Sequence, residues 1–133
     1  MKKGFTLIEL LAVIIILAIV ALVATPIVLN VIETAEQSAA ESEGKMIVSG
    51  IEQGCAARKM AANLDDKIDE CGNSLDKAAV EELVDLGSAT LTENITIDSA
   101  TGKVTDLGDL SSNGYEIDFD SKGKITASKP KSQ

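Results

Sequence analysis

The strongest constraint in this sequence is a run of 23 residues, Leu10 to Ile32, without a charged side chain. Almost every position in the run is Leu, Ile, Val or Ala. A helix of this length extends about 35 Å, which is enough to cross a hydrocarbon core of about 30 Å. Lys2 and Lys3 precede the run, so the positive-inside rule predicts a cytoplasmic start and an external remainder.

Composition argues against an enzyme. The 133 residues are enough for one small domain. The absence of His removes Ser-His-Asp and Cys-His catalysis and the most common zinc ligand. With two Phe, one Tyr and no Trp, the chain has almost no stacking surface for bases or sugars, and its net charge of −9 disfavours binding to DNA. We therefore expect no catalytic residue, metal or cofactor.

Two ordinary interpretations of the N-terminus leave observations unexplained. A secretory signal peptide has an apolar region of about 7–15 residues, shorter than this one. Its cleavage would also be awkward after Ala24, because the bulky Leu22 precedes it and Pro26 follows it. A plain membrane anchor explains neither Gly4 nor Glu9, a carboxylate that would cost about 2.5–3.5 kcal/mol in the middle of a bilayer.

The first nine residues, Met1-Lys-Lys-Gly-Phe-Thr-Leu-Ile-Glu9, carry a resemblance to a known family. Followed by a long apolar helix that contains Pro26, they resemble the N-terminus of type IV prepilins and pseudopilins, and the close match covers about residues 1–35. The resemblance implies that a prepilin peptidase cuts after Gly4 and methylates the new terminus at Phe5. It also implies that Phe5, Glu9 and Pro26 serve assembly.

The chain is accordingly expected to have three parts. Residues 1–4 are a cleaved leader, residues 5–32 are the transmembrane and filament-core half of a helix, and residues 33–133 form a globular head. Pro26 should kink the helix, because proline lacks an amide hydrogen and its ring clashes with the preceding turn. In related filaments the helix is often unwound just before this proline, and we expect unwinding only on assembly.

Residues 34–57 should continue the helix in an amphipathic form. An apolar stripe at helical spacing is expected to face the head, whereas Glu41, Glu43 and Glu52 can face water. The stripe consists of Ile47, Val48, Ile51 and Cys55. Glycines at positions 44, 50 and 54 weaken a helix; they could allow close packing or flexing, but we interpret them as tolerated surface residues.

Residues 58–72 are expected to form a connecting loop. Its acidic stretch, residues 65–70, suggests calcium, but the spacing does not follow an EF-hand and a solvated loop is favoured. Cys55 and Cys71 would face an oxidising space after export, so we favour a disulfide over two free thiols. A loop of about 17 residues gives about 3 kcal/mol of stabilisation. Ser74 is expected to cap a short amphipathic helix that ends at Gly87.

The last third alternates with period 2. Residues 94–98 and 103–107 predict one hairpin, and residues 115–120 and 125–127 predict a second. Together they give an antiparallel sheet of three or four strands whose apolar face suits the helical stripe. The expected fold is therefore α+β, a long helix on a small sheet, which is also the pilin architecture.

Two charged groups in the last third are candidate sites. Asp118 and Asp120 could form an acidic catalytic pair, but their alternation with core residues indicates the solvent side of a strand. Four lysines near the C-terminus could bind DNA or an acidic surface; a solubilising tail is favoured. These lysines are Lys122, Lys124, Lys129 and Lys131.

The sequence thus predicts a bacterial structural subunit similar to a major type IV pilin. As the resemblance implies, it would wait in the cytoplasmic membrane and then polymerise into an extracellular filament. Its partners would be prepilin peptidase, an assembly ATPase, a platform protein and copies of itself. The alternatives are a major pseudopilin of a type II secretion or competence system, and a membrane-anchored binding domain that never polymerises.

Overall fold

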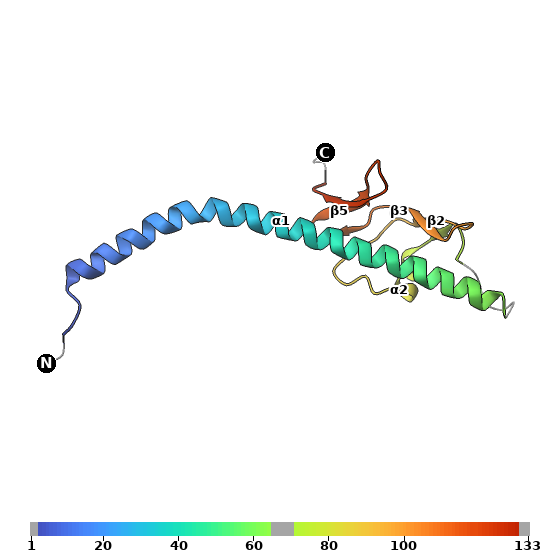
Figure 1. Cartoon of the computed structure of the whole chain (residues 1–133), viewed down its shortest axis with the longest axis horizontal. Coiled ribbons are helices and arrows are strands. Elements are labelled where there is room, and N and C mark those ends of the chain that lie inside the picture. Colours follow the sequence, from blue (N-terminus) through green and yellow to red (C-terminus); the bar gives the residue numbers. More distant parts are fainter. Residues whose placement is uncertain (1–2, 65–70, 131–133) are drawn as a thin grey trace. The chain divides into compact units, whose positions relative to one another are not determined.

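The computed structural model describes residues 3–64 and 71–130. The chain divides into two compact units, Met1–Ala35 and Glu36–Gln133. Helix α1 (Leu7–Ala62) contributes to both units, and all strands lie in the second (Figure 1). The long helix and small antiparallel sheets confirm the expected α+β fold.

The first unit is the apolar half of α1, and its side chains are exposed. The exposed fraction of Phe5 is 93%, and that of Ile32 is still 46%. The helix is long and apolar enough to cross a membrane, judged by length and composition alone. An apolar surface of this extent requires lipid or the helices of partners.

The end of α1 differs from the prediction. The helix continues to Ala62, so residues 58–62 are helical and not part of a connecting loop. Arg, Lys, Met and Ala, which make up this segment, are all good helix formers, and Lys59 lies in the last turn where a cation favours the helix dipole. Arg58 also pairs with Glu82 of the head at 2.8 Å.

The head contains two small sheets, where one was expected. The first joins β1 (Ser74–Leu75), β2 (Ile95–Asp98) and β3 (Lys103–Asp106), all antiparallel. The second joins β4 (Ser111–Ser112), β5 (Tyr115–Phe119) and β6 (Ile125–Ser128), also antiparallel.

Both predicted hairpins are confirmed, as β2–β3 and β5–β6. The sheets are separate because the chain turns between β3 and β4 at Gly108, whose φ of +60° suits glycine. Leu107 and Leu110 on either side of that turn are fully buried. The turn is thus anchored in the core, and β3 does not run on to pair with β4.

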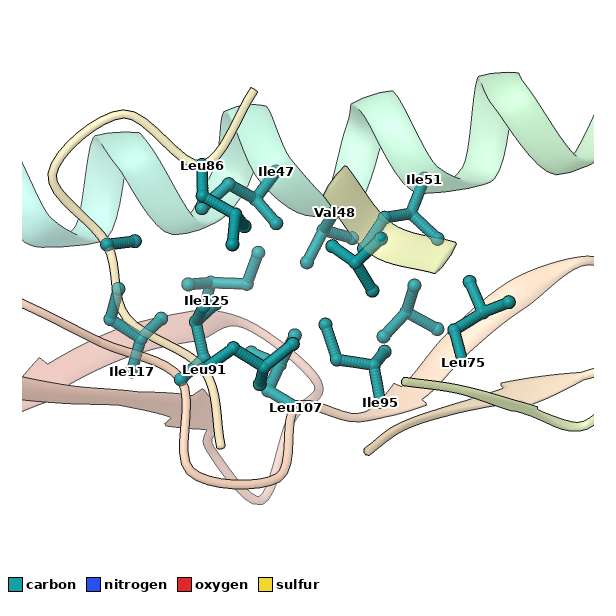
Figure 2. Packing of buried hydrophobic residues seen from close by; sticks show 14 of the residues in the cluster. Ile47, Val48, Ile51, Leu75, Leu86, Leu91, Ile95, Leu107, Ile117 and Ile125 are labelled. Atoms are coloured by element: carbon teal, nitrogen blue, oxygen red, sulfur yellow. The ribbon is translucent and has the colours of Figure 1, made fainter. Parts of the chain in front are cut away.

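The core of the head lies between α1 and the strands. Figure 2 shows Ile47, Val48 and Ile51 of α1 among residues from both sheets and the connecting loops. The predicted stripe is confirmed, since all four of its residues are buried. The fully buried large side chains in the core are Ile47, Ile51, Val80, Leu91, Ile95, Leu107, Leu110 and Ile117.

Helix α2 (Lys77–Leu83) begins differently from the prediction. Its N-cap is Asp76, whose carboxylate accepts a hydrogen bond from the amide of Ala79, and not Ser74, which lies in β1. The capping preference of Ser and Asp is similar, so the pairing of Ser74 with Thr96 in the sheet decides between them.

The interpretation of the three α1 glycines as surface residues is wrong. A Cβ on Gly44 would lie 2.5 Å from Cγ2 of Ile117. A Cβ on Gly50 would lie 2.7 Å from Cγ2 of Val84, and one on Gly54 would lie 2.9 Å from Cδ2 of Leu83. The glycines therefore allow the head to approach the helix backbone closely, which offsets their low helix propensity.

Candidate functional site

The predicted cleavage position lies outside the helix. Residues 3–6 have no regular secondary structure and are exposed, and α1 begins at Leu7. A Cβ built on Gly4 would meet no atom within 4 Å. The peptide bond between Gly4 and Phe5 is therefore in accessible, non-helical chain, the form in which a peptidase can bind a substrate.

Glu9 lies in the first turn of α1 and is held by Thr6. Its Oε2 atom accepts a hydrogen bond from the amide of Thr6 at 2.8 Å and one from the Thr6 hydroxyl at 2.7 Å. In return, the amide of Glu9 donates to Oγ1 of Thr6 at 3.3 Å. This reciprocal arrangement is a capping box, and it places a carboxylate where the positive end of the helix dipole favours it.

Thr6 was missed in the sequence analysis, although a signal for it exists. A Thr followed three residues later by a Glu, just before an apolar run, is the pattern of a capping box. The resemblance to prepilins points only to the glycine, the phenylalanine and the glutamate of the motif. The structure thus adds Thr6 as the partner of Glu9 within one chain.

Pro26 lies inside α1, which is continuous on both sides of it. Proline cannot donate the hydrogen bond that would reach the carbonyl four residues earlier. One residue before it, the hydroxyl of Thr25 donates to the carbonyl oxygen of Ala21 at 2.7 Å. The chain is nonetheless helical on both sides of the proline in this single subunit.

Cys55 and Cys71 form a disulfide, with their Cα atoms 5.4 Å apart. Cys55 comes from the buried stripe of α1, and Cys71 precedes β1. The acidic stretch weighed as a calcium site, residues 65–70, lies outside the described residues. Among the residues that are described, no group of three His, Cys, Asp or Glu side chains could hold a metal ion.

Glu43 and Glu52, which were expected to face water, instead bind the head. Glu52 Oε1 accepts a hydrogen bond from the amide of Val104 at 3.2 Å. Glu43 accepts hydrogen bonds from the amide and hydroxyl of Ser88, both at 2.9 Å, and from the hydroxyl of Ser112. These carboxylates attach α1 to the loop between α2 and β2 and to both sheets.

The pKa of Glu43 reflects two opposing effects. Burial raises the pKa, but hydrogen bonds from Ser112 and Ser88 outweigh it and hold the pKa below its ordinary value. Gly87, beside this cluster, has a φ of +59°, and a Cβ there would lie 2.7 Å from Glu43 Oε1. The carboxylate thus joins α1 to Ser88 and Ser112 of the head.

Of the other charged candidates, Asp118 and Lys129 line one surface cavity. Asp118 is exposed, as expected for the solvent side of β5. Asp120 accepts hydrogen bonds from the amides of Lys124 and Lys122, which lower its pKa and stabilise the turn before β6. The side chains of Lys122, Lys124 and Lys129 are exposed, and Lys131 lies outside the described part of the chain.

Comparison with known proteins bears on the first 25 residues. The prokaryotic N-terminal methylation motif matches residues 1–25. The chain carries a prepilin-type N-terminus. The matched segment contains Gly4, Phe5 and Glu9 but leaves out the head. No curated protein and no solved structure matches the chain.

The matched motif and the fold agree with each other. The motif, the apolar helix and the helix-on-sheet head together describe a type IV pilin- or pseudopilin-like subunit. Proteins of this kind are typically structural and not enzymes, they are processed by prepilin peptidase, and they are associated with the bacterial inner membrane or secretion.

Proposed function

We propose that this protein is the structural subunit of a type IV pilus filament, similar to a major pilin. The observation that carries the proposal is the combination of a prepilin-type motif with an apolar half-helix whose large side chains are exposed in the described part of the chain. Cytoplasmic membrane lipid covers that surface in the precursor. Neighbouring helices cover it in a filament, with the acidic heads outside.

Processing prepares the subunit to move from the membrane into a filament. Cleavage between Gly4 and Phe5 removes the positive charges of Lys2 and Lys3 and creates a single new amine on Phe5. Without the lysines, the helix is held less firmly at the cytoplasmic face, where cationic side chains favour retention. N-methylation of Phe5 keeps its positive charge.

Glu9 then has a defined role. An isolated carboxylate among apolar helices is costly, and the Phe5 amine of an adjacent subunit is the cation that cleavage supplies. Pairing of the two would offset both desolvation penalties and fix the axial position of each subunit, which is the best-attested use of a buried ion pair. Pro26 marks the point where α1 unwinds on assembly.

The proposal implies partners that supply energy and guidance. The chain has no P-loop sequence, so an assembly ATPase and a platform protein must drive extraction from the membrane. The competing proposal, a pseudopilin of a secretion or competence system, uses the same N-terminus and differs in the length of the filament made.

The test is to shear intact cells and examine the supernatant by electron microscopy and mass spectrometry. The proposal predicts long extracellular filaments in which this protein is the dominant subunit, beginning at a methylated Phe5. Short filaments confined to the cell envelope would indicate a pseudopilin. Protein found only in the membrane fraction, with no filaments under conditions that express it, would contradict both.

A further inference from the structure

The two residues that join β4 to β5 are Asn113 and Gly114, and both have a left-handed backbone. Their φ angles are +52° and +79°, and the flanking residues Ser112 and Tyr115 pair with each other across the two strands. Two positive φ values in a two-residue hairpin loop are typical of a type I′ turn, for which Asn-Gly is a preferred sequence. The same pair of residues is also chemically reactive.

An asparagine can react with the next residue of its own chain. The backbone nitrogen of that residue loses its proton and attacks the side-chain carbon Cγ, and a cyclic imide (succinimide) forms as ammonia leaves. Water then opens the ring at either of its two carbonyl groups, which gives aspartate or isoaspartate. The reaction consumes only water, and because it is intramolecular, its rate depends on how freely the two groups approach each other.

The surroundings of Asn113 favour this approach. Asn113 and Gly114 are both exposed, and a Cβ built on Gly114 would meet no atom within 4 Å. Within the described part of the chain, no hydrogen bond holds the side-chain amide of Asn113 or the backbone N–H of Gly114. Ring closure requires rotation about the Cα–C bond of Asn113. Since β4 has only two residues, opening the turn locally breaks few hydrogen bonds.

The other asparagines of the chain lack this combination, because none of them precedes a glycine. Asn94, for example, is followed by the branched Ile95, and its Nδ2 atom donates a hydrogen bond to the hydroxyl of Ser74 at 3.1 Å. Asn30 lies inside α1, where backbone N–H groups are held by helical hydrogen bonds. The asparagines available for comparison are Asn30, Asn63, Asn73 and Asn94.

A change at this turn would reach the attachment of α1. Ser112, next to Asn113, is 2% exposed, and its hydroxyl donates a hydrogen bond to Glu43 Oε2. Isoaspartate places an additional carbon atom in the main chain, so it lengthens a two-residue turn and displaces Ser112. We propose that Asn113 deamidates spontaneously with the nitrogen of Gly114 as nucleophile, and that the isoaspartyl product weakens the contact between Ser112 and Glu43. The inference does not depend on filament formation.

The test is to age the purified full-length protein in detergent at mildly alkaline pH, where the Gly114 amide loses its proton faster. Each peptide that contains an asparagine is then followed by mass spectrometry. Asn113→Gly is the matched control, because Gly-Gly also suits a type I′ turn and carries no side-chain amide. Asn113→Asp represents the other product of ring opening, with a main chain of normal length.

We expect the Asn113 peptide to convert about tenfold faster than the peptides of the other asparagines, the ratio given by a barrier lower by about 1.4 kcal/mol. Both aspartate and isoaspartate should form at position 113. Aged wild-type protein should unfold at a lower temperature than fresh protein. Fresh Asn113→Asp should unfold close to fresh wild type, and Asn113→Gly should not change with age.

Three outcomes would count against the proposal. An Asn113 peptide that stays unmodified in the folded protein, or converts only after denaturation, overturns it. Formation of aspartate alone overturns it as well, because direct hydrolysis of the side chain gives no isoaspartate. Isoaspartyl protein that unfolds at the same temperature as fresh protein contradicts the weakening of the contact between Ser112 and Glu43.

Discussion

Gln37 of α1 donates a hydrogen bond of 2.7 Å from Nε2 to the carbonyl oxygen of Ala127, in the outer strand β6. Glu52, further along the same helix, accepts one from the amide of Val104 in β3, the outer strand of the other sheet. Unpaired backbone N–H and C=O groups on outer strands can form hydrogen bonds with strands of other chains. Because α1 occupies these two groups, they are unavailable to a strand from another molecule.

Processing is the first property to test. Replacing Gly4 by Leu places a bulky side chain at the bond to be cut, where the native residue has none. We expect uncleaved precursor to accumulate in the membrane. Intact-mass measurement of the membrane fraction should then show a chain that still begins at Met1 or Lys2. A wild-type chain that begins after Ala24 would instead identify a signal peptide.

The second prediction concerns the charge of Glu9. Glu9→Gln keeps the size of the side chain and removes its charge, and Glu9→Val removes its polarity. Both variants should be cleaved and inserted but fail to form normal filaments when expressed alone, since the defect lies in recruitment. Glu41→Gln is the control, because Glu41 forms only a weak surface pair with Lys45 at 3.9 Å. Wild-type numbers of filaments made of Glu9→Val subunits would refute this account.

The third prediction concerns the disulfide. Converting Cys55 and Cys71 to Ser should lower the free energy of unfolding of the head by about 3 kcal/mol, the chain-entropy value for a loop of this size. Thermal unfolding of the purified protein in detergent measures the loss. Alkylation of the folded wild type without reductant should label neither cysteine, and two labelled thiols per chain would show that the bridge is absent.

The fourth prediction ranks substitutions of two α1 glycines by their cost in stability. Gly44→Ala should destabilise the head by about 1–3 kcal/mol through overpacking, because its Cβ would press on the branched Ile117 at 2.5 Å. Gly54→Ala should cost less, since the Leu83 methyl group that it meets at 2.9 Å can move. Ser49→Ala, at an exposed position of the same helix, is the control. Equal unfolding temperatures for all three variants would contradict the packing described.

The fifth prediction concerns the contribution of Glu43 to stability as the pH changes. Its pKa is lowered in the folded state, so its contribution to stability is present above the unfolded pKa and is lost as the pH falls through the folded value. Glu43→Gln should be less stable than wild type at pH 7 by about 1 kcal/mol or more. The difference between the two proteins should shrink as the pH is lowered below about 4.

The difference between the two unfolding curves is the quantity to compare. Asp98, Asp109 and Asp120 also have lowered pKa values, caused for Asp98 and Asp120 chiefly by hydrogen bonds from nearby backbone amides. For Asp109, burial raises the pKa, and hydrogen bonds from Thr92 and Glu93 outweigh it. The wild-type curve alone therefore reports several groups. A gap between wild type and Glu43→Gln that is constant with pH would contradict the role given to Glu43.

Local patterns in the sequence were sufficient to predict much of this fold. The apolar stripe of α1 and the two alternating hairpins indicate directly which side chains are buried. Side-chain direction repeats every 3.6 residues in a helix and every 2 residues in a strand. The prepilin-type N-terminus was also evident, since its charge, glycine and apolar run must occur in a fixed order. These features depend on residues that are close together in the chain.

The features that were missed depend on partners far apart in the sequence. Glu43 and Ser112 are 69 residues apart, so no local pattern distinguishes a clamped glutamate from a solvated one. The need for glycine at position 44 is explained only by the closeness of Ile117. The division into two sheets is explained only by the buried turn around Gly108. Thr6 is the exception, because the Thr-x-x-Glu spacing was visible in the sequence.

The bridge between Cys55 and Cys71 has a mechanical consequence for a subunit under tension. In the filament proposed above, pulling would transmit force along α1 into each head. The disulfide links the helix covalently to the segment that leads into β1, so the load can pass from helix to sheet through a sulfur–sulfur bond. The chain between the two cysteines is thereby excluded from the path of the force, and the head can resist extension at that point without unfolding.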